Sequence, residues 1–230
     1  MKYKINLRGL MIPNDYKWIY DFLGMESTCP KDVLDILDKT IPGDEVEVYI
    51  NSPGGVIDVG SEIYTALRAT DAEVKIYITG QACSAASIVA MAGYCEMSPT
   101  ALMMVHCVST ETSGNHSAME HTAEVLRTAD RALCTAYTEK TGMSETEALA
   151  MMEKETWLSA NRAKEHNLID KIMFEEKENH QMVAGPEFRL PDKTEMENIR
   201  KMLKLDDDGN KTTVSEMQCK LNLLKLKNIS

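Results

Sequence analysis

Short strands and helices alternate along the middle of the chain, and this alternation restricts the fold more than any other feature of the sequence. The segments 46–51 (VEVYIN), 74–80 (VKIYITG) and 101–107 (ALMMVHC) are predicted to be strands from their alternating or continuously apolar residues. Between them, 61–70 is predicted to be a helix, and another helix opens near Ser84. Strands joined by helices form right-handed crossovers, so the sequence predicts a mainly parallel sheet in an α/β fold.

Further elements flank this region. They are predicted as a strand at 3–11, a short helix at 32–39, a loop at 52–55 (SPGG), a long helix at 117–141 ended by Gly142, a helix capped by Ser144 and Glu147, and a short helix from Ser159 with Asn167 as its left-handed cap. We expect residues 1–174 to form one domain. Past Phe174 the chain becomes charged, and 175–230 is predicted to be a mostly helical tail of unknown role, with helices at 192–205 and 215–227.

The composition excludes several classes of protein. A net charge of −11 argues against nucleic-acid binding, because phosphates repel an acidic surface. There is neither a signal-peptide apolar region nor an apolar run of about 18 residues, so we expect no membrane partner and a cytoplasmic protein. The cysteines are scattered without metal-ligand spacing, which indicates reduced, buried thiols. No metal and no cofactor are expected.

Residues suited to acyl transfer follow three of the predicted strands. Gly54 and Gly55 follow the first, Ser84 follows the second, and His106 lies at the end of the third. Ligands gather at the carboxyl ends of strands in open α/β sheets, so these residues are expected at one edge. There the histidine can activate the serine hydroxyl as a general base, while the backbone N–H groups of Gly55 and Ala85 stabilise a developing oxyanion.

Each of these features also has a purely structural interpretation. A serine in an alanine-rich helix is usually a small packing residue, and a histidine that ends a strand usually satisfies local hydrogen bonds. The SPGG segment alone is a common turn. Their joint placement at one sheet edge favours a shared site without proving one.

Four sequence blocks, in unbroken order over residues 5–173, resemble the Clp-type serine peptidases (ClpP-like). They are INSPGGVIDVGSEIYTAL, GQACSAASIVAMAG, MMVHC and ETWLSANRAKEHNLIDKI. The SAAS-x-x-AMAG form and the ETW block are most similar to the phage branch, the prohead or head-maturation proteases. The resemblance implies a spiral of β-α-β units, as in ClpP and the crotonases, with a protruding handle helix.

The resemblance also implies roles for individual residues. Ser84 would be the nucleophile and His106 the general base, with Glu155 as the acid and Gly55 and Ala85 as the oxyanion hole. The best-known members of the family have aspartate at the acid position, whereas this chain has a glutamate that is one methylene longer.

That departure leaves two other acids open. Glu153 or Asp170 would orient His106 if Glu155 does not.

The resemblance has consequences for partners as well. The chain begins almost at the first core strand, without the gating segment that meets the family's ATPase, which argues against a Clp ATPase partner. The helix at 117–141 takes the place of the handle, so we expect a homo-oligomeric ring or stacked rings, with Met119 and Leu126 at the interface. Alternatively, this face of the helix packs in the core of the single chain.

Three functions compete at this point. The first is a serine endopeptidase, uncoupled from ATP, that processes phage head or scaffold proteins in the cytoplasm of a bacterial host or within assembling heads. The second is a catalytically weak ClpP-like assembly protein. The third is a crotonase-type acyl-CoA enzyme, which the presence of both Ser84 and His106 disfavours.

Overall fold

The computed structural model describes residues 1–175 and 193–203. The chain divides into two units, Met1–Glu176 and Lys177–Ser230. Of the second unit the structure describes α8 (Lys193–Leu203), which corresponds to the helix predicted at 192–205. The helix predicted at 215–227 lies outside the described residues. Within the described part of the chain, no helix is both long and apolar enough to cross a membrane.

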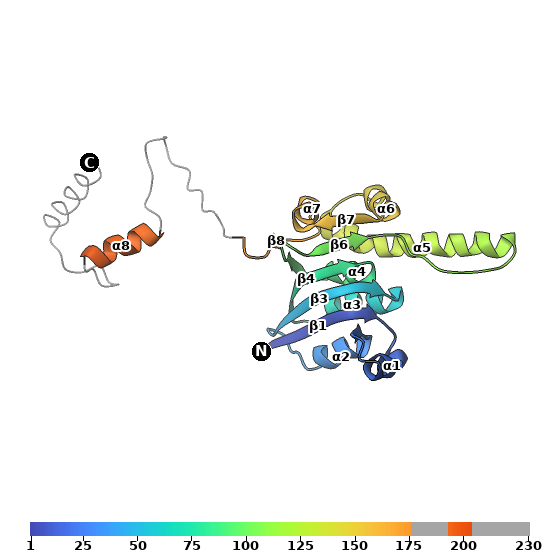
Figure 1. Ribbon diagram of the computed structural model, residues 1–230, viewed down its shortest axis with the longest axis horizontal. Coiled ribbons are helices and arrows are strands. Elements are labelled where there is room, and N and C mark those ends of the chain that lie inside the picture. The colour runs from blue at the N-terminus through green and yellow to red at the C-terminus, as the bar shows by residue number, and fades with distance from the viewer. Residues whose placement is uncertain (176–192, 204–230) are drawn as a thin grey trace. The chain divides into compact units, whose positions relative to one another are not determined.

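The first unit alternates strands and helices (Figure 1). Its strands are β1 (Lys2–Met11), β2 (Ser27–Thr28), β3 (Glu45–Gly55), β4 (Glu73–Cys83), β5 (Tyr94–Met97), β6 (Leu102–Val105), β7 (Thr156–Ser159) and β8 (Lys171–Ile172). Its helices are the 3₁₀ turn η1 (Asn14–Tyr16), α1 (Lys17–Phe22), α2 (Pro30–Leu37), α3 (Ile57–Ala69), α4 (Ala85–Ala90), α5 (His116–Thr141), α6 (Glu145–Glu153) and α7 (Ala160–Glu165).

The strands form one mainly parallel sheet. Its main path runs β2-β1-β3-β4-β5-β8, and every neighbouring pair on this path is parallel. β6 joins the sheet beside the end of β4, also in parallel, and β7 pairs with β6 in the antiparallel direction. The α/β fold with a mainly parallel sheet, predicted from the alternation of strands and helices, is confirmed.

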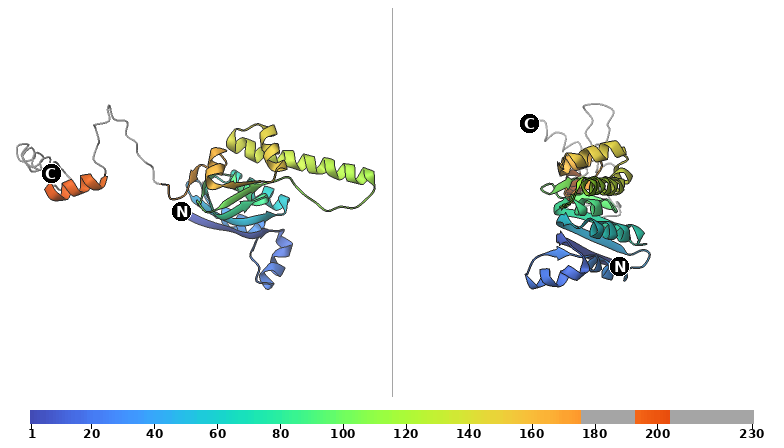
Figure 2. Two further views of the ribbon diagram at one scale, coloured as in Figure 1. Left: turned by 45° about the horizontal axis from the view of Figure 1, so that its top comes forward. Right: turned by 90° about the vertical axis from the view of Figure 1, so that its right-hand side faces the viewer.

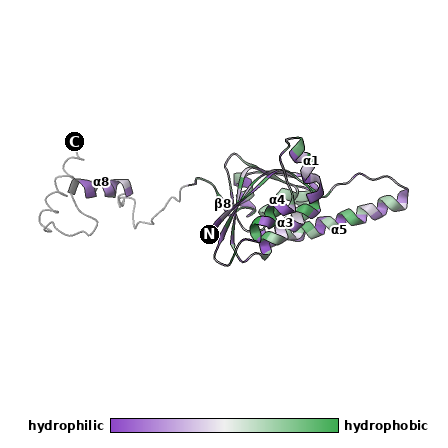
Figure 3. Ribbon diagram, turned by 90° about the horizontal axis from the view of Figure 1, so that it is seen from below, coloured by the Kyte–Doolittle hydropathy of each residue, from purple (hydrophilic) through white to green (hydrophobic). Residues whose placement is uncertain are grey.

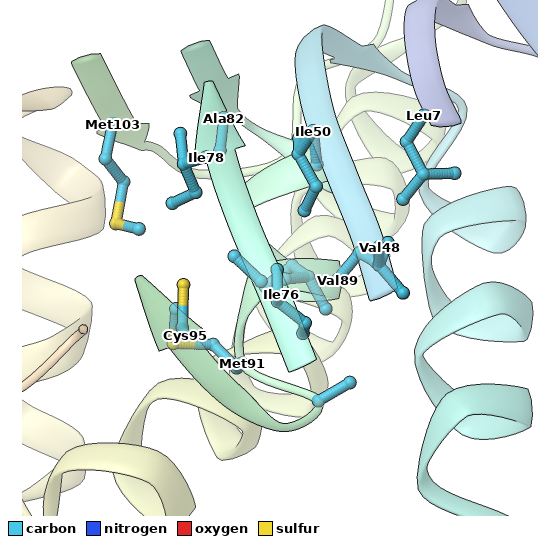
Figure 4. Packing of buried hydrophobic residues seen from close by; sticks show 14 of the residues in the cluster. Leu7, Val48, Ile50, Ile76, Ile78, Ala82, Val89, Met91, Cys95 and Met103 are labelled. Atoms are coloured by element: carbon cyan, nitrogen blue, oxygen red, sulfur yellow. The ribbon is translucent and has the colours of Figure 1, made fainter. Parts of the chain in front are cut away.

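The hydrophobic core lies on one side of the central strands. Val46, Val48 and Ile50 alternate along β3 and are fully buried. Figure 4 shows Val48 and Ile50 close to core residues of β4. The helices α3 and α4 pack against each other on this side (Figure 3). Side chains on the other face are more polar, and include the stacked rings of Tyr49 and Tyr77. The strand alternation therefore fixes which side receives the helices.

The SPGG segment is part of a strand, so its prediction as a loop was wrong. β3 continues through it to Gly55, which pairs with Met11 of β1 after a shift in register. Gly55 has a φ of 151°, and a Cβ at this position would collide with the backbone of Met11. Glycine is therefore required for β3 to stay paired with β1 up to the edge of the sheet.

Four strands were not predicted from the sequence. These are β2 and β8, each two residues long, and β5 and β7, each four residues long. The strand predicted at 101–107 is β6, which is shorter than predicted and ends at Val105. In the sheet, β4 therefore lies between β3 and β5. β6 is not part of this main path and pairs with the last residues of β4.

The long helix α5 extends away from the sheet (Figure 2). It is capped by Asn115 and ends at Gly142, as predicted, and the φ of Gly142 is left-handed at 76°. Its buried residues are Cys134, Ala136 and Tyr137, all near its C-terminal end. Met119, near the other end, is 39% exposed, so this part of the helix does not pack in the core of the single chain.

The predicted helix boundaries around α6 and α7 are also confirmed. Ser144 and Glu147 form a capping box at the start of α6. Ser159 caps α7 through Arg162 N–H, and Asn167 has a left-handed φ of 58° just after that helix.

Candidate active site

Ser84 lies in a strained turn between β4 and α4. Its backbone angles are φ 55° and ψ −127°, which is unfavourable for a residue with a side chain. The Ser84 N–H donates to the carbonyl of Met104 in β6 at 2.9 Å. A sharp strand-to-helix turn of this kind projects a side chain from the edge of a sheet, as in the nucleophile elbow of the α/β-hydrolase fold.

His106 faces this serine. Its Nε2 lies 2.7 Å from Ser84 Oγ, a hydrogen-bond distance. Strand pairing explains the contact, because Cys83 is in register with Met104 and His106 follows two residues later. The backbone after His106 is held by Val108 N–H, which donates to Asp130 Oδ1 at 2.7 Å.

The two predicted oxyanion donors lie beside the pair. Gly54 N–H donates to the Ser52 hydroxyl, and Val56 N–H donates to the Met11 carbonyl. Because N–H groups alternate in direction along a strand, the Gly55 N–H is directed away from β1. Ala85 is the first residue of α4, so its N–H has no acceptor within that helix.

These groups surround one cavity of about 300 Å³. Ser84, His106, Gly55 and Ala85 line it together. Most of its remaining lining is apolar and comes from β1, α3, α4, β6, α5 and α6: Leu10, Ile57, Ile88, Met104, Leu133 and Met152. A cavity with convergent polar groups on an apolar lining is typical of a ligand-binding site.

Glu155 is placed near His106 by strand register, but its carboxylate is directed elsewhere. β6 and β7 pair Val105 with Thr156, so one further step places Glu155 opposite His106. Glu155 has a φ of 46°, and its Oε1 accepts a hydrogen bond from the Trp157 indole at 3.4 Å. Within residues 1–175, no hydrogen bond joins Glu155 to His106.

The other acids considered differ in their surroundings. Asp170 accepts from Cys95 N–H at 2.7 Å and from Lys140 Nζ at 2.5 Å. Cys95 pairs with Ile76, well before the end of β4, so Asp170 does not belong to the edge that holds Ser84. Glu153 is exposed at the end of α6.

The thiols near the site favour their protonated form. Burial is the main cause that raises the pKa of Cys83, which directly precedes Ser84. Burial and the nearby Asp130 carboxylate raise the pKa of Cys107, on the cavity wall, to about 11. Nucleophilic chemistry by cysteine needs a thiolate, so these thiols are poorly suited to it near neutral pH.

Sequence reasoning missed two polar residues beside the site. Ser87 and Tyr137 share a hydrogen bond of 2.7 Å, and Tyr137 lines the cavity. Tyr137 lies within the long helix predicted at 117–141, and burial raises the pKa of its hydroxyl. The available signal was Ser87 itself, the one polar residue of an otherwise apolar α4.

The arrangement is chemically suited to acyl transfer. A serine in contact with a histidine, next to backbone N–H donors, can attack a carbonyl and stabilise the resulting oxyanion. Among the described residues, no group of three or more His, Cys, Asp or Glu side chains is placed to hold a metal ion.

Comparison with known proteins agrees with this class of site. Residues 27–176 match the family model for Clp protease. The ATP-dependent Clp protease proteolytic subunit of Bacteroides fragilis is 30% identical over 141 residues, covering 60% of this chain and 68% of that protein. Proteolytic subunit 1 from Chlamydia muridarum is 31% identical over 144 residues, covering 60% and 74%. The chain belongs to the Clp protease family, a family of serine peptidases.

Proposed function

We propose that this protein is a serine endopeptidase in which Ser84 forms an acyl-enzyme and His106 is the general base. The observation that supports this most strongly is the 2.7 Å contact between His106 Nε2 and Ser84 Oγ at the wall of the cavity. The strained backbone of Ser84 is a second support, because such strain concentrates at functional positions.

The reaction follows from the positions of these atoms. His106 Nε2 removes the proton from Ser84 Oγ as the oxygen attacks the peptide carbonyl. The N–H groups of Gly55 and Ala85 stabilise the tetrahedral oxyanion. His106 then gives the proton to the departing amine, leaving an ester on Ser84. Water hydrolyses this ester by the same route and restores the serine.

Labelling with a fluorophosphonate tests the proposed nucleophile. We expect a single adduct on Ser84, located by mass spectrometry, because the reagent phosphonylates activated serines. Ser84→Ala is expected to show no adduct. Ser109→Ala is the control for position, because it removes another serine hydroxyl from the cavity lining, and it is expected to keep the adduct on Ser84. An intact wild-type protein that gains no adduct at Ser84 would contradict the proposal and favour the assembly-protein alternative.

We assign the orienting acid to Glu155 on the basis of strand register. A rotation of its exposed side chain away from Trp157 would bring the carboxylate toward the imidazole. Glu155→Gln is expected to lower kcat by about 100-fold. This is a smaller loss than in serine proteases whose acid is hydrogen-bonded to the histidine, because within residues 1–175 Glu155 makes no such bond.

Asp170→Asn provides the comparison for this assignment. It removes the carboxylate that accepts hydrogen bonds from Cys95 N–H and Lys140 Nζ. It is therefore expected to lower the melting temperature and to leave kcat within about twofold of the wild-type value. Casein hydrolysis and thermal unfolding measure the two effects. The assignment would be wrong if Asp170→Asn lost activity in the folded state while Glu155→Gln kept it.

The substrate class we propose is phage head or scaffold protein, processed in the cytoplasm of a bacterial host or within assembling heads. The support is the form of the SAASIVAMAG and ETWLSA blocks, which resemble the phage branch of the family. The apolar cavity beside Ser84 supports recognition of an apolar side chain next to the cleaved bond.

The assembly we propose is a ring or stacked rings of this chain. Its support is the exposed outer part of α5, where Met119 is 39% exposed. The acyl-enzyme chemistry itself consumes no ATP, so we also propose that peptide hydrolysis proceeds without an ATPase. The relatives from Bacteroides fragilis and Chlamydia muridarum are named as subunits of ATP-dependent proteases.

A further inference from the structure

Two hydroxyl groups are buried behind the strained serine. Ser87 of α4 is fully buried, and Tyr137 of α5 is 3% exposed. All the other residues of α4 are alanine, isoleucine or valine. Burying a hydroxyl among apolar groups costs free energy unless it is hydrogen-bonded, and these two hydroxyls bond to each other at 2.7 Å.

The direction of these hydrogen bonds is determined by the number of protons. Ser87 Oγ donates to the carbonyl oxygen of Ser84 at 2.6 Å. A serine hydroxyl has one proton to donate, so the Tyr137 hydroxyl must be the donor in its bond to Ser87. The bonds therefore run in one direction, from Tyr137 to Ser87 to the backbone of Ser84.

This carbonyl belongs to the same peptide unit as the Ala85 N–H. The peptide is planar and trans, so its C=O and N–H point in opposite directions. A group that fixes the Ser84 oxygen consequently fixes the direction of the Ala85 N–H. The Ser87 N–H also reaches this oxygen, at 2.9 Å, but a backbone bond of that kind begins many helices and does not require either hydroxyl.

We propose that Ser87 and Tyr137 are positioning residues that hold the Ser84–Ala85 peptide so that its N–H points at the oxyanion. This rests on the proposed function, in which Ala85 N–H is an oxyanion donor. A hydrogen-bonded chain lowers the freedom of a peptide that is strained at φ 55°. Tyr137 thereby acts on the chemistry from α5 through Ser87, although its ring also lines the cavity.

Tyr137→Phe tests the hydrogen-bonded chain from Tyr137 through Ser87 to the Ser84 carbonyl, because it removes the hydroxyl and keeps the ring. The probe is a fluorophosphonate, whose maximal inactivation rate (kinact) and half-saturating concentration (KI) are measured separately by intact mass. Its phosphonyl oxygen occupies the position of the oxyanion. We expect kinact to fall about tenfold and KI to stay within about twofold, because binding is kept while stabilisation of the transition state is weakened.

Three further variants complete the experiment. Ser87→Ala is expected to lower kinact as Tyr137→Phe does, and the double variant is expected to lower it no further, since both residues act through one bond. Tyr64→Phe is the matched control, because it removes another tyrosine hydroxyl that contacts α5, at Glu139, away from the cavity. It is expected to leave kinact unchanged.

The possible outcomes separate this inference from the proposed function. If wild-type Ser84 forms no adduct, the peptidase proposal fails and the inference fails with it. If wild type reacts and Tyr137→Phe and Ser87→Ala keep kinact within about twofold, only the inference is overturned. A lower melting temperature with unchanged kinact has the same meaning, because it shows a purely structural role.

Discussion

His106→Gln is expected to lower the rate of peptide hydrolysis by about 10⁶-fold, as loss of the base does in other serine peptidases. Glutamine can still hydrogen-bond to Ser84 Oγ, which lies 2.7 Å from the imidazole nitrogen in the present structure. It cannot take up the serine proton near neutral pH or return that proton to the departing amine. Hydrolysis of casein, followed by release of soluble peptides, measures the loss.

His121→Gln is the control for this substitution. His121 is an exposed residue of α5 and does not line the cavity. The control is expected to hydrolyse casein at the wild-type rate, and both variants should unfold at the wild-type temperature. A folded His106→Gln protein that keeps more than about one hundredth of the activity would show that His106 is not the base.

Gly54→Ala is expected to lower the rate of hydrolysis by about 10³-fold, the scale at which loss of an oxyanion donor acts. A Cβ on Gly54 would lie 2.5 Å from the Cys83 carbonyl oxygen, 2.8 Å from Ser84 Cβ and 3.0 Å from the Ala85 nitrogen. These atoms belong to the turn that presents the nucleophile and a predicted oxyanion donor. The added methyl group must therefore displace this turn. Acyl transfer requires the nucleophile and the oxyanion donor to be placed within a fraction of an ångström, so the displacement is expected to slow the reaction.

Gly43→Ala separates this collision from backbone strain. Gly43 and Gly54 have nearly the same left-handed φ, 91° and 92°, but a Cβ on Gly43 would meet nothing within 4 Å. The unfavourable φ should lower the free energy of unfolding by about 1 kcal/mol in both variants. The collision should lower it further in Gly54→Ala. Only Gly54→Ala is expected to lose activity. Equal activity of the two folded variants, measured on casein, would contradict the close packing of Gly54 against the site.

The edge that holds the site could be predicted from the sequence because the strands are parallel. Strands joined by helical crossovers all end at the same edge, so the sequence alone predicts that Gly55, Ser84 and His106 lie near one another. The structure brings these residues around one cavity. Their proposed chemical roles came from the resemblance to a family, since a strand pattern contains no information about proton transfer.

Other features depend on pairings that leave no periodic signal. β7 is four residues long and contacts β6 in the antiparallel direction, so neither its length nor its place among parallel strands indicated it. The Ser87–Tyr137 bond joins residues 50 positions apart in two different helices, and no local sequence pattern indicates such a contact. The direction of the Glu155 carboxylate depends on the rotamer of its side chain and on a left-handed backbone φ. Neither of these can be predicted from the sequence.

The turn at Ser84 also implies a compromise between stability and activity. A non-glycine residue held at φ 55° and ψ −127° costs roughly 1–3 kcal/mol relative to a relaxed backbone. Glycine would relieve this cost, so a chain selected for stability alone would place glycine at position 84. The serine is consistent with selection for reactivity, with the surrounding core compensating for one unfavourable residue.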